Sequence, residues 1–247
     1  VLAIGSPYSH VSGTESGHVR IFKNVSGVWT QIGSNINGEA TGDNSGSCVS
    51  LSSDGNTVAI GSPYGYYSET QSGQVRIFKN VSGVWTKIGS NINGTANIKF
   101  GSSVSLSSNG NIVAVGAPFS NENGYHTGHV RVYENLSGVW TEIGSAIIGA
   151  EAVSESGWSV SLSSDGSIVA FGAPNAILGD GHVRIFKNVE GVWTPMGSII
   201  GRDGNFGSSV SLSSSGRIVA MGGYSNRDDA GDVRVFDITA VLASDSF

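Results

Sequence analysis

The stretch Val-Ser-Leu-Ser-Ser-Asp-Gly-Asn-Thr-Val-Ala-Ile-Gly, residues 49–61, decides the fold because it describes a hairpin of two short strands. Apolar residues alternate with serine over 49–52 and a short apolar run covers 58–60, and both patterns predict β-strands. Asp54 and Gly55 lie between them, and such a pair favours a tight hairpin turn. A third strand is expected at Val-Arg-Ile-Phe, residues 75–78, and a fourth around Trp85, after a four-residue turn. The stretch therefore predicts an antiparallel unit of four short strands.

The same unit recurs five times along the chain. Its third-strand arginines are spaced 50–56 residues apart, at Arg20, Arg76, Arg131, Arg184 and Arg234. Repeated four-stranded units of this length predict an all-β fold, a five-bladed β-propeller of four-stranded antiparallel blades. We expect one domain over residues 1–247, with units at about 1–45, 46–100, 101–156, 157–206 and 207–247.

The two ends of the chain do not match the unit. The first unit begins at its second strand, and the fifth lacks the Gly-Val-Trp segment of the fourth strand. We expect the tail over 238–247 to supply one strand and close the ring. Two alternatives stay open: the chain is an excerpt that has lost residues, or a neighbouring molecule completes the sheet by strand addition.

Composition argues against several classes of protein. Only 13% of the 247 residues are charged and the net charge is −6, which disfavours binding to nucleic-acid phosphates. No apolar run approaches the roughly 20 residues that cross a bilayer, so direct membrane insertion is not expected. One cysteine cannot form an internal disulfide or supply a zinc cage. We expect no metal and no cofactor.

The first two strands of each unit resemble the FG-GAP repeat of the integrin α-chain propeller. Phe100 and Gly101, followed by Gly116, Ala117 and Pro118, match the motif literally, and the resemblance covers nearly the whole chain. It implies a propeller. Many repeats of that family carry a calcium loop between these strands, but the matching loops here retain at most one carboxylate each, so no calcium sites are expected. That family has seven blades, so its ligand surface is not transferred to these five units.

Aromatic residues gather in the loops between the second and third strands, which vary most between units. Loops on a rigid scaffold commonly carry binding function, and exposed rings suit sugars or a protein partner. The alternative is that each ring covers its own loop. The predicted ligand-binding residues are Tyr64, Tyr66, Tyr67, Phe119 and Tyr125.

Trp158 is added to the ligand-binding set because it breaks the repeat. We align it with the small residues Cys48, Ser103 and Ser209 of the other units. A single deviation on an inner strand marks either a binding site or a plug in the axial channel. Both interpretations stay open.

Other repeated residues are interpreted as scaffold. Each third-strand arginine is expected to stack on an aromatic ring or bind loop carbonyls between blades. The tryptophans Trp29, Trp85, Trp140 and Trp193 are expected to pack between blades. His18, His129 and His182 share one repeat position and are expected to be polar rim residues, not metal ligands.

An extracellular location is expected from the low charge, the richness in Ser and Gly and the FG-GAP resemblance, and four sequons are possible glycan acceptors there; about four would arise by chance. Asn24, Asn80, Asn93 and Asn135 each begin Asn-x-Ser/Thr, the acceptor pattern for N-glycosylation. Three of them occupy the same turn between the third and fourth strands. Asparagine is also a good turn residue, which is the alternative reading of that position.

The sequence contains no recognisable catalytic constellation, so we expect that the chain is not an enzyme. A polysaccharide-cleaving propeller is disfavoured because the first strand offers Ser, Val and Leu in place of inward carboxylates. The function predicted is a non-enzymatic extracellular module for adhesion or assembly, either part of a surface protein or the protomer of a filament. Its expected partners are other proteins or copies of itself. The alternative is a lectin-like glycan binder that uses the loop aromatics.

Overall fold

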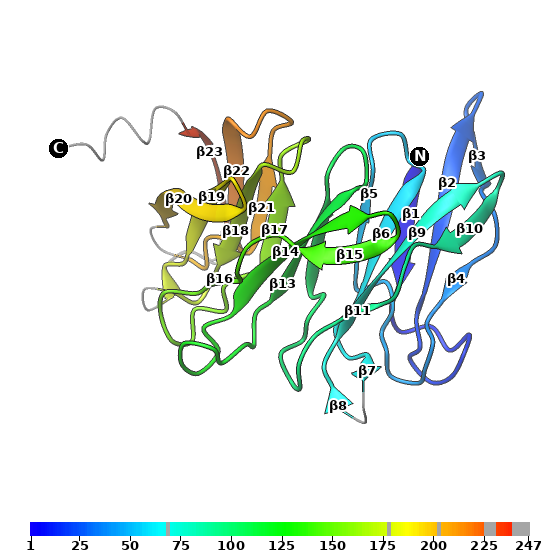
Figure 1. Cartoon of the computed structure of the whole chain (residues 1–247), viewed down its shortest axis with the longest axis horizontal. Helices are drawn as coiled ribbons and strands as arrows, with labels where there is room; N and C mark the ends of the chain where they lie inside the picture. The colour runs from blue at the N-terminus through cyan, green and yellow to red at the C-terminus, as the bar shows by residue number, and fades with distance from the viewer. Residues whose placement is uncertain (68–69, 177–178, 202–203, 225–230, 239–247) are drawn as a thin grey trace.

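The computed structural model describes residues 1–67, 70–176, 179–201, 204–224 and 231–238. The protein is an all-β, five-bladed β-propeller, as the sequence predicts, with one small antiparallel sheet for each blade (Figure 1). Successive blades lie side by side, and the innermost strands of neighbouring blades are in contact.

The strands fall into blades as follows. The first blade has β1 (Leu2–Ser6), β2 (His18–Val25), β3 (Val28–Gln31) and β4 (Ile36–Asn37). The second has β5 (Cys48–Leu51), β6 (Thr57–Ser62), β9 (Gln74–Val81), β10 (Val84–Lys87) and β11 (Ile92–Asn93), with a hairpin of β7 (Tyr66–Tyr67) and β8 (Thr70–Gln71) in its loop. The third has β12 (Ser103–Leu106), β13 (Ile112–Ala117), β14 (His129–Leu136), β15 (Val139–Glu142) and β16 (Ile147–Ile148). The fourth has β17 (Ser159–Leu162), β18 (Ile168–Ala173), β19 (His182–Val189) and β20 (Val192–Ile200), and the fifth β21 (Ser209–Leu212), β22 (Ile218–Gly223) and β23 (Asp232–Asp237).

Within a complete blade the strands pair antiparallel in chain order. The outer strand is split in two in the first three blades, so that β15 and β16 pair with opposite ends of β14. The turn from the third to the outer strand has two residues, not the four expected. In the first blade these are Ser26 and Gly27, with φ of 51° and 89°, which is the geometry of the tight turn that matches strand twist.

Serine side chains connect the innermost strands of neighbouring blades. The backbone N–H of Leu106 in the third blade donates to the Ser50 hydroxyl of the second blade at 3.0 Å. The same bond recurs from Leu162 to Ser105 and from Leu212 to Ser161. These bonds give the alternating serines of the Val-Ser-Leu-Ser repeat a structural role, because an unpaired buried N–H is costly.

Each hydrophobic cluster lies at a junction between two successive blades. At the junction of the second and third blades, Val75 and Ile77 of β9 share a cluster with Val113 and Val115 of β13. Equivalent residues form the other three clusters. A small four-stranded sheet cannot bury both faces alone, so the neighbouring blade supplies what each face requires.

The indole of each internal tryptophan also binds the preceding blade. Nε1 of Trp140 donates to the carbonyl of Ile88 at 3.0 Å, and Trp85 and Trp193 make the same bond to Ile32 and Ile143. The predicted packing role of these tryptophans is confirmed. Trp29, in the first blade, is 52% exposed.

Replacing Trp140 by Phe should destabilise the protein by about 1–2 kcal/mol, because one hydrogen bond between blades and some packing are lost. The midpoint of urea unfolding measures the effect. Trp29→Phe is the matched control and should change the free energy of unfolding by less than about 0.5 kcal/mol, as is usual for exposed positions. Equal effects at the two positions would contradict this role.

The first and fifth blades lie at opposite ends of the molecule in Figure 1. In the first blade, β1 pairs only with β2, so the described residues supply no innermost strand there. The fifth blade has no outer strand among the described residues. The tail expected to close the ring lies, apart from Ile238, outside the described residues. Within the described chain we find no helix long and apolar enough to cross a membrane.

Candidate functional site

Three of the predicted aromatic residues lie together with a lysine and a histidine. We call Tyr64, Lys99, Phe119, Tyr125 and His126 the aromatic cluster. Nζ of Lys99 lies 5.0 Å from the centre of the Tyr64 ring and 4.2 Å from that of Phe119. His126 meets Phe119 edge-on at 4.7 Å and stacks on Tyr125 at 3.9 Å. The cluster therefore joins loops of the second and third blades.

The aromatic cluster offers exposed ring faces on a fixed support. Tyr125 is 65% and Tyr64 36% exposed, whereas Phe119 and His126 are half-buried. The backbone N–H of His126 donates to Oδ1 of Asn121 at 2.8 Å, and that of Phe119 to the carbonyl of Ile98 at 3.4 Å. A cation over an aromatic face is an attractive contact, so Lys99 holds two rings of different blades together.

A carboxylate adjoins the cluster. Burial raises the pKa of Glu155, although the charges of His126 and Lys99 oppose that shift. The cluster and Glu155 together combine aromatic faces, hydrogen-bond donors and one carboxylate. This combination can bind a polyol or a polar peptide segment through stacking and hydrogen bonds.

Lys99 and His126 were not predicted from the sequence. Lys99 directly precedes the Phe-Gly motif, at a repeat position occupied by Asn44, Glu155 and Asn205 in other units. All four residues have φ between 49° and 54°. The repeat predicts a tight turn at this position, but the side chain is Asn in two units, Lys in one and Glu in one, so the repeat alone does not single out Lys99.

The remaining predicted residues are placed as follows. Tyr66 and Tyr67 form β7, which pairs with β8, and their side chains lie outside the described part of the structure. Trp158 is 42% exposed, and its backbone N–H donates to the carbonyl of Glu155 at 3.1 Å. Trp158 and Glu155 therefore lie in the same backbone turn.

The alignment of Trp158 with Cys48, Ser103 and Ser209 was wrong by one residue. In the strand register, Ser159 pairs with Gly172 just as Cys48 pairs with Gly61. The true equivalents of Trp158 are Ser47, Ser102 and Ser208, whose hydroxyls bond the carbonyls three residues earlier, at 2.6–2.8 Å. Trp158 thus replaces a turn-closing serine just before the innermost strand.

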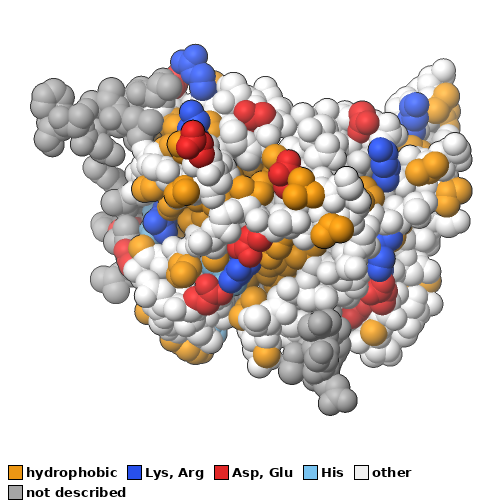
Figure 2. Space-filling view, viewed as in Figure 1, with side chains coloured by type: hydrophobic (Ala, Val, Ile, Leu, Met, Phe, Trp, Pro, Cys, Tyr) orange, Lys and Arg blue, Asp and Glu red, His pale blue; other side chains and the backbone are white. Residues whose placement is uncertain are grey.

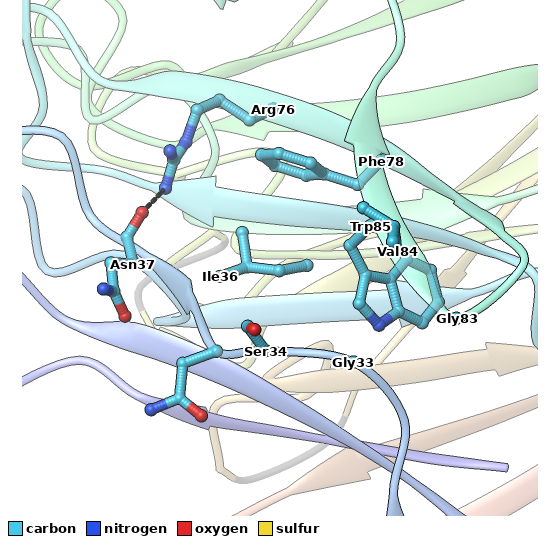
Figure 3. Close-up of a pocket in the computed structure, with 10 residues that line it drawn as sticks. Gly33, Ser34, Ile36, Asn37, Arg76, Phe78, Gly83, Val84 and Trp85 are labelled. Carbon is cyan, nitrogen blue, oxygen red and sulfur yellow. Dashed lines mark hydrogen bonds between the residues drawn. The ribbon is translucent and has the colours of Figure 1, made fainter.

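Grooves on the outer side recur between neighbouring blades. The groove between the first two blades has a volume of about 310 Å³ and is lined by Ile36, Arg76, Phe78 and Trp85, among others (Figure 3). Corresponding grooves follow at the next two junctions, with volumes of about 360 and 330 Å³. Because similar residue types line each of them, we interpret these grooves as a consequence of blade packing.

Arg76 and Arg184 have the scaffold role predicted for the arginines. Arg76 donates to the carbonyl of Asn37 in β4 of the preceding blade at 2.9 Å (Figure 3). It also donates to the hydroxyl of Ser45, which precedes β5, at 2.8 Å. Arg184 donates to the carbonyl of Ile148 at 2.9 Å, and its guanidinium lies over the ring of Phe186. Bonds to the preceding blade therefore recur along the propeller.

A smaller polar pocket at the junction of the second and third blades departs from this repeat. It has a volume of about 210 Å³ and is lined by Glu122, His129, Arg131 and Tyr133, among others. Arg131 binds both oxygens of Glu142 at 2.9 Å and Glu122 at 3.0 Å. One guanidinium thus bridges two carboxylates beside this pocket.

His129 is almost fully buried beside this pocket. Burial lowers its pKa to about 4, so the imidazole is neutral near pH 7. Glu122 lies 3.2 Å from Nδ1, yet neither ring nitrogen has a hydrogen-bond partner among the described residues. His18 and His182 are buried as well, so the expectation that these histidines are rim residues was wrong.

Charges are sparse on the face shown in Figure 2, where acidic and basic side chains lie in small mixed groups. Among the described residues there is no group of three or more His, Cys, Asp or Glu side chains that could hold a metal ion. The Asp54 carboxylate accepts bonds from Ser52 and from the backbone of Asn56, which lower its pKa.

Comparison with solved structures shows the fold alone, because the identities are low. The chain is similar to a putative 6-phosphogluconolactonase from Bacteroides fragilis NCTC 9343, with a TM-score of 0.61 and 16% identity, over 91% of this chain and 61% of that chain. It is also similar to hydrazine synthase of Kuenenia stuttgartiensis, with a TM-score of 0.55 and 14% identity, over 89% and 64% of the two chains. The chain thus spans less than two thirds of each. No protein-family model and no curated protein matches it.

These comparisons correct two expectations. The propeller fold is supported, but no match supports membership of the FG-GAP or integrin family. The expectation that the chain is not an enzyme is contradicted, because a solved structure of the same fold bears the name of an enzyme. That expectation relied on the absence of a familiar catalytic pattern from the sequence. Such an absence does not exclude an enzyme.

Proposed function

We propose that the chain is an extracellular module that binds other molecules for adhesion, with the aromatic cluster as its recognition surface. The observation that carries the proposal is the convergence of Tyr64, Phe119 and Tyr125 from the loops of two blades around Lys99 and His126. Exposed aromatic rings on a rigid support are enriched where proteins bind partners. The FG-GAP resemblance of the strand motifs belongs to this proposal and supports an adhesive role.

Glycan binding by the same cluster is the second candidate. Tyr125 supports it, because the ring is highly exposed and is held by stacking on His126. Sugar rings stack on such faces, and Lys99 within the cluster and Glu155 beside it are groups that can hydrogen-bond to sugar hydroxyls. A labelled protein tested on a glycan array and on immobilised matrix proteins separates the two candidates.

Tyr125→Ala should weaken whichever binding is detected by about tenfold, since one stacking contact contributes about 1.4 kcal/mol. Tyr8→Ala is the matched control: Tyr8 is 72% exposed in the corresponding loop of the first blade, and its loss should leave the affinity unchanged. Binding that survives Tyr125→Ala and Tyr64→Ala together would refute this site. Absence of binding both to the glycan array and to the immobilised matrix proteins would refute the adhesive role.

The extracellular part of the proposal is supported by the position of the sequons. Oδ1 of Asn24, Asn80 and Asn135 accepts the N–H of a turn glycine at 2.7–2.9 Å. The other atom of the amide, Nδ2, is the one to which a glycan is attached. Expression in a secreting eukaryotic host and intact-mass measurement tests whether Asn24, Asn80, Asn93 and Asn135 are occupied.

A further inference from the structure

The propeller builds the same blade junction four times, and each junction has two different halves. The preceding blade contributes the apolar pair of its third strand, as Val75 and Ile77 do in β9. The following blade contributes the apolar pair of its second strand, as Val113 and Val115 do in β13. These four side chains are at most 1% exposed. The two halves are therefore complementary to each other.

Each terminal blade leaves one of these halves uncovered. In β1, Leu2 and Ile4 are 44% and 41% exposed, although they occupy the positions of Val113 and Val115. In β23, Val233 and Val235 are 72% and 64% exposed at the positions of Val75 and Ile77. We call the first pair the leading face and the second pair the trailing face.

The first blade also carries, besides the leading face, two polar groups whose equivalents in other blades bind the preceding blade. Arg20 is exposed, whereas its equivalent Arg76 is 3% exposed and bonds to the blade before it. Trp29 is 52% exposed, whereas its equivalent Trp85 donates to the carbonyl of Ile32. Four exposed side chains of the first blade thus occupy the positions that contact the preceding blade at an internal junction.

The two faces cannot meet within the described molecule, because the first and fifth blades lie at its opposite ends (Figure 1). Among the described residues, therefore, no trailing face contacts a leading face. We propose that the trailing face of one copy packs against the leading face of a second copy, forming a further junction of the kind that the chain already builds internally. Unlike faces associate head to tail, and such contacts give a closed ring or an open filament. This proposal is independent of ligand binding by the aromatic cluster.

Complementation between two variants tests the proposal. Ile4→Asp removes the leading face and keeps the trailing face, whereas Val235→Asp does the opposite. A charge buried at an apolar junction without a partner is costly, so each variant alone should be monomeric and at least tenfold weaker in association than the unaltered chain. An equimolar mixture should form a one-to-one complex and nothing larger, because each variant retains one intact face.

Sedimentation velocity over a wide range of protein concentration measures these states, and circular dichroism confirms that each variant is folded. Val139→Asp is the control, because Val139 is 64% exposed on the outer strand of the third blade and should leave association unchanged. An unaltered chain that stays monomeric throughout overturns the proposal. So does a mixture that fails to associate, or a Val235→Asp variant that still dimerises alone, since that requires like faces to meet.

Discussion

Phe171→Ala is expected to lower the free energy of unfolding by about 4 kcal/mol, because it removes a fully buried ring at the junction of the third and fourth blades. Phe171 stacks on Phe186 with ring centres 5.6 Å apart, inside the cluster that includes Val130 and Val132 of the preceding blade. The side chains around it are themselves buried in this cluster, so the space left by the ring is not readily filled. Urea unfolding followed by tryptophan fluorescence measures the loss.

Ile4→Ala provides the matched control for this prediction. Ile4 occupies the same position in β1 but is 41% exposed, so its truncation should cost only about 1 kcal/mol. Phe171→Met, which approximately conserves volume, should cost less than about 1.5 kcal/mol. Similar losses for the two alanine variants would show that the junction does not contribute the packing energy inferred here.

Gly116→Ala should destabilise the protein by about 3 kcal/mol, because neighbouring blades approach each other through glycine backbone. A Cβ at Gly116 would overlap the carbonyl of Gly157 in the next blade, and Gly5, Gly61 and Gly172 make equivalent approaches. The clash involves backbone on both sides, so it cannot be relieved by turning a side chain. Differential scanning calorimetry or denaturant unfolding measures the effect.

Gly138→Ala separates this clash from ordinary backbone strain. Gly138 has a φ of 93° and an added Cβ would meet no atom within 4 Å, so its replacement should cost about 1–2 kcal/mol through conformation alone. If Gly116→Ala costs no more than Gly138→Ala, the close approach of the blades is not tight.

The blade architecture was predictable because each unit repeats the same local signals. Alternating Val-Ser-Leu-Ser residues, a tight turn and a Val-Arg strand appear together, and consistent local signals specify one fold. The scaffold roles of Arg76 and Trp140 followed from repetition as well, since a residue required at every junction must appear in every unit. Residues that occur once carry no such signal.

The candidate site was predictable only in part. The aromatic loops could be selected because they break the repeat, but nothing in the sequence says that Tyr64 and Phe119 meet across Lys99. That contact depends on the relative placement of two loops and the residue before a Phe-Gly motif. Trp158 was misaligned by one position because Ser102 and Ser103 are identical neighbours. Only the strand register distinguishes them.

The direction of the contacts between blades has a consequence for how such arrays change in evolution. The second blade carries its own indole and guanidinium for the blade before it, and its Ser50 receives a backbone N–H of the blade after it. A duplicated gene segment encoding one unit arrives with both sets of connectors. Copy number can therefore grow or shrink by recombination without compensating substitutions at the new boundaries, which leaves loop sequences free to diversify.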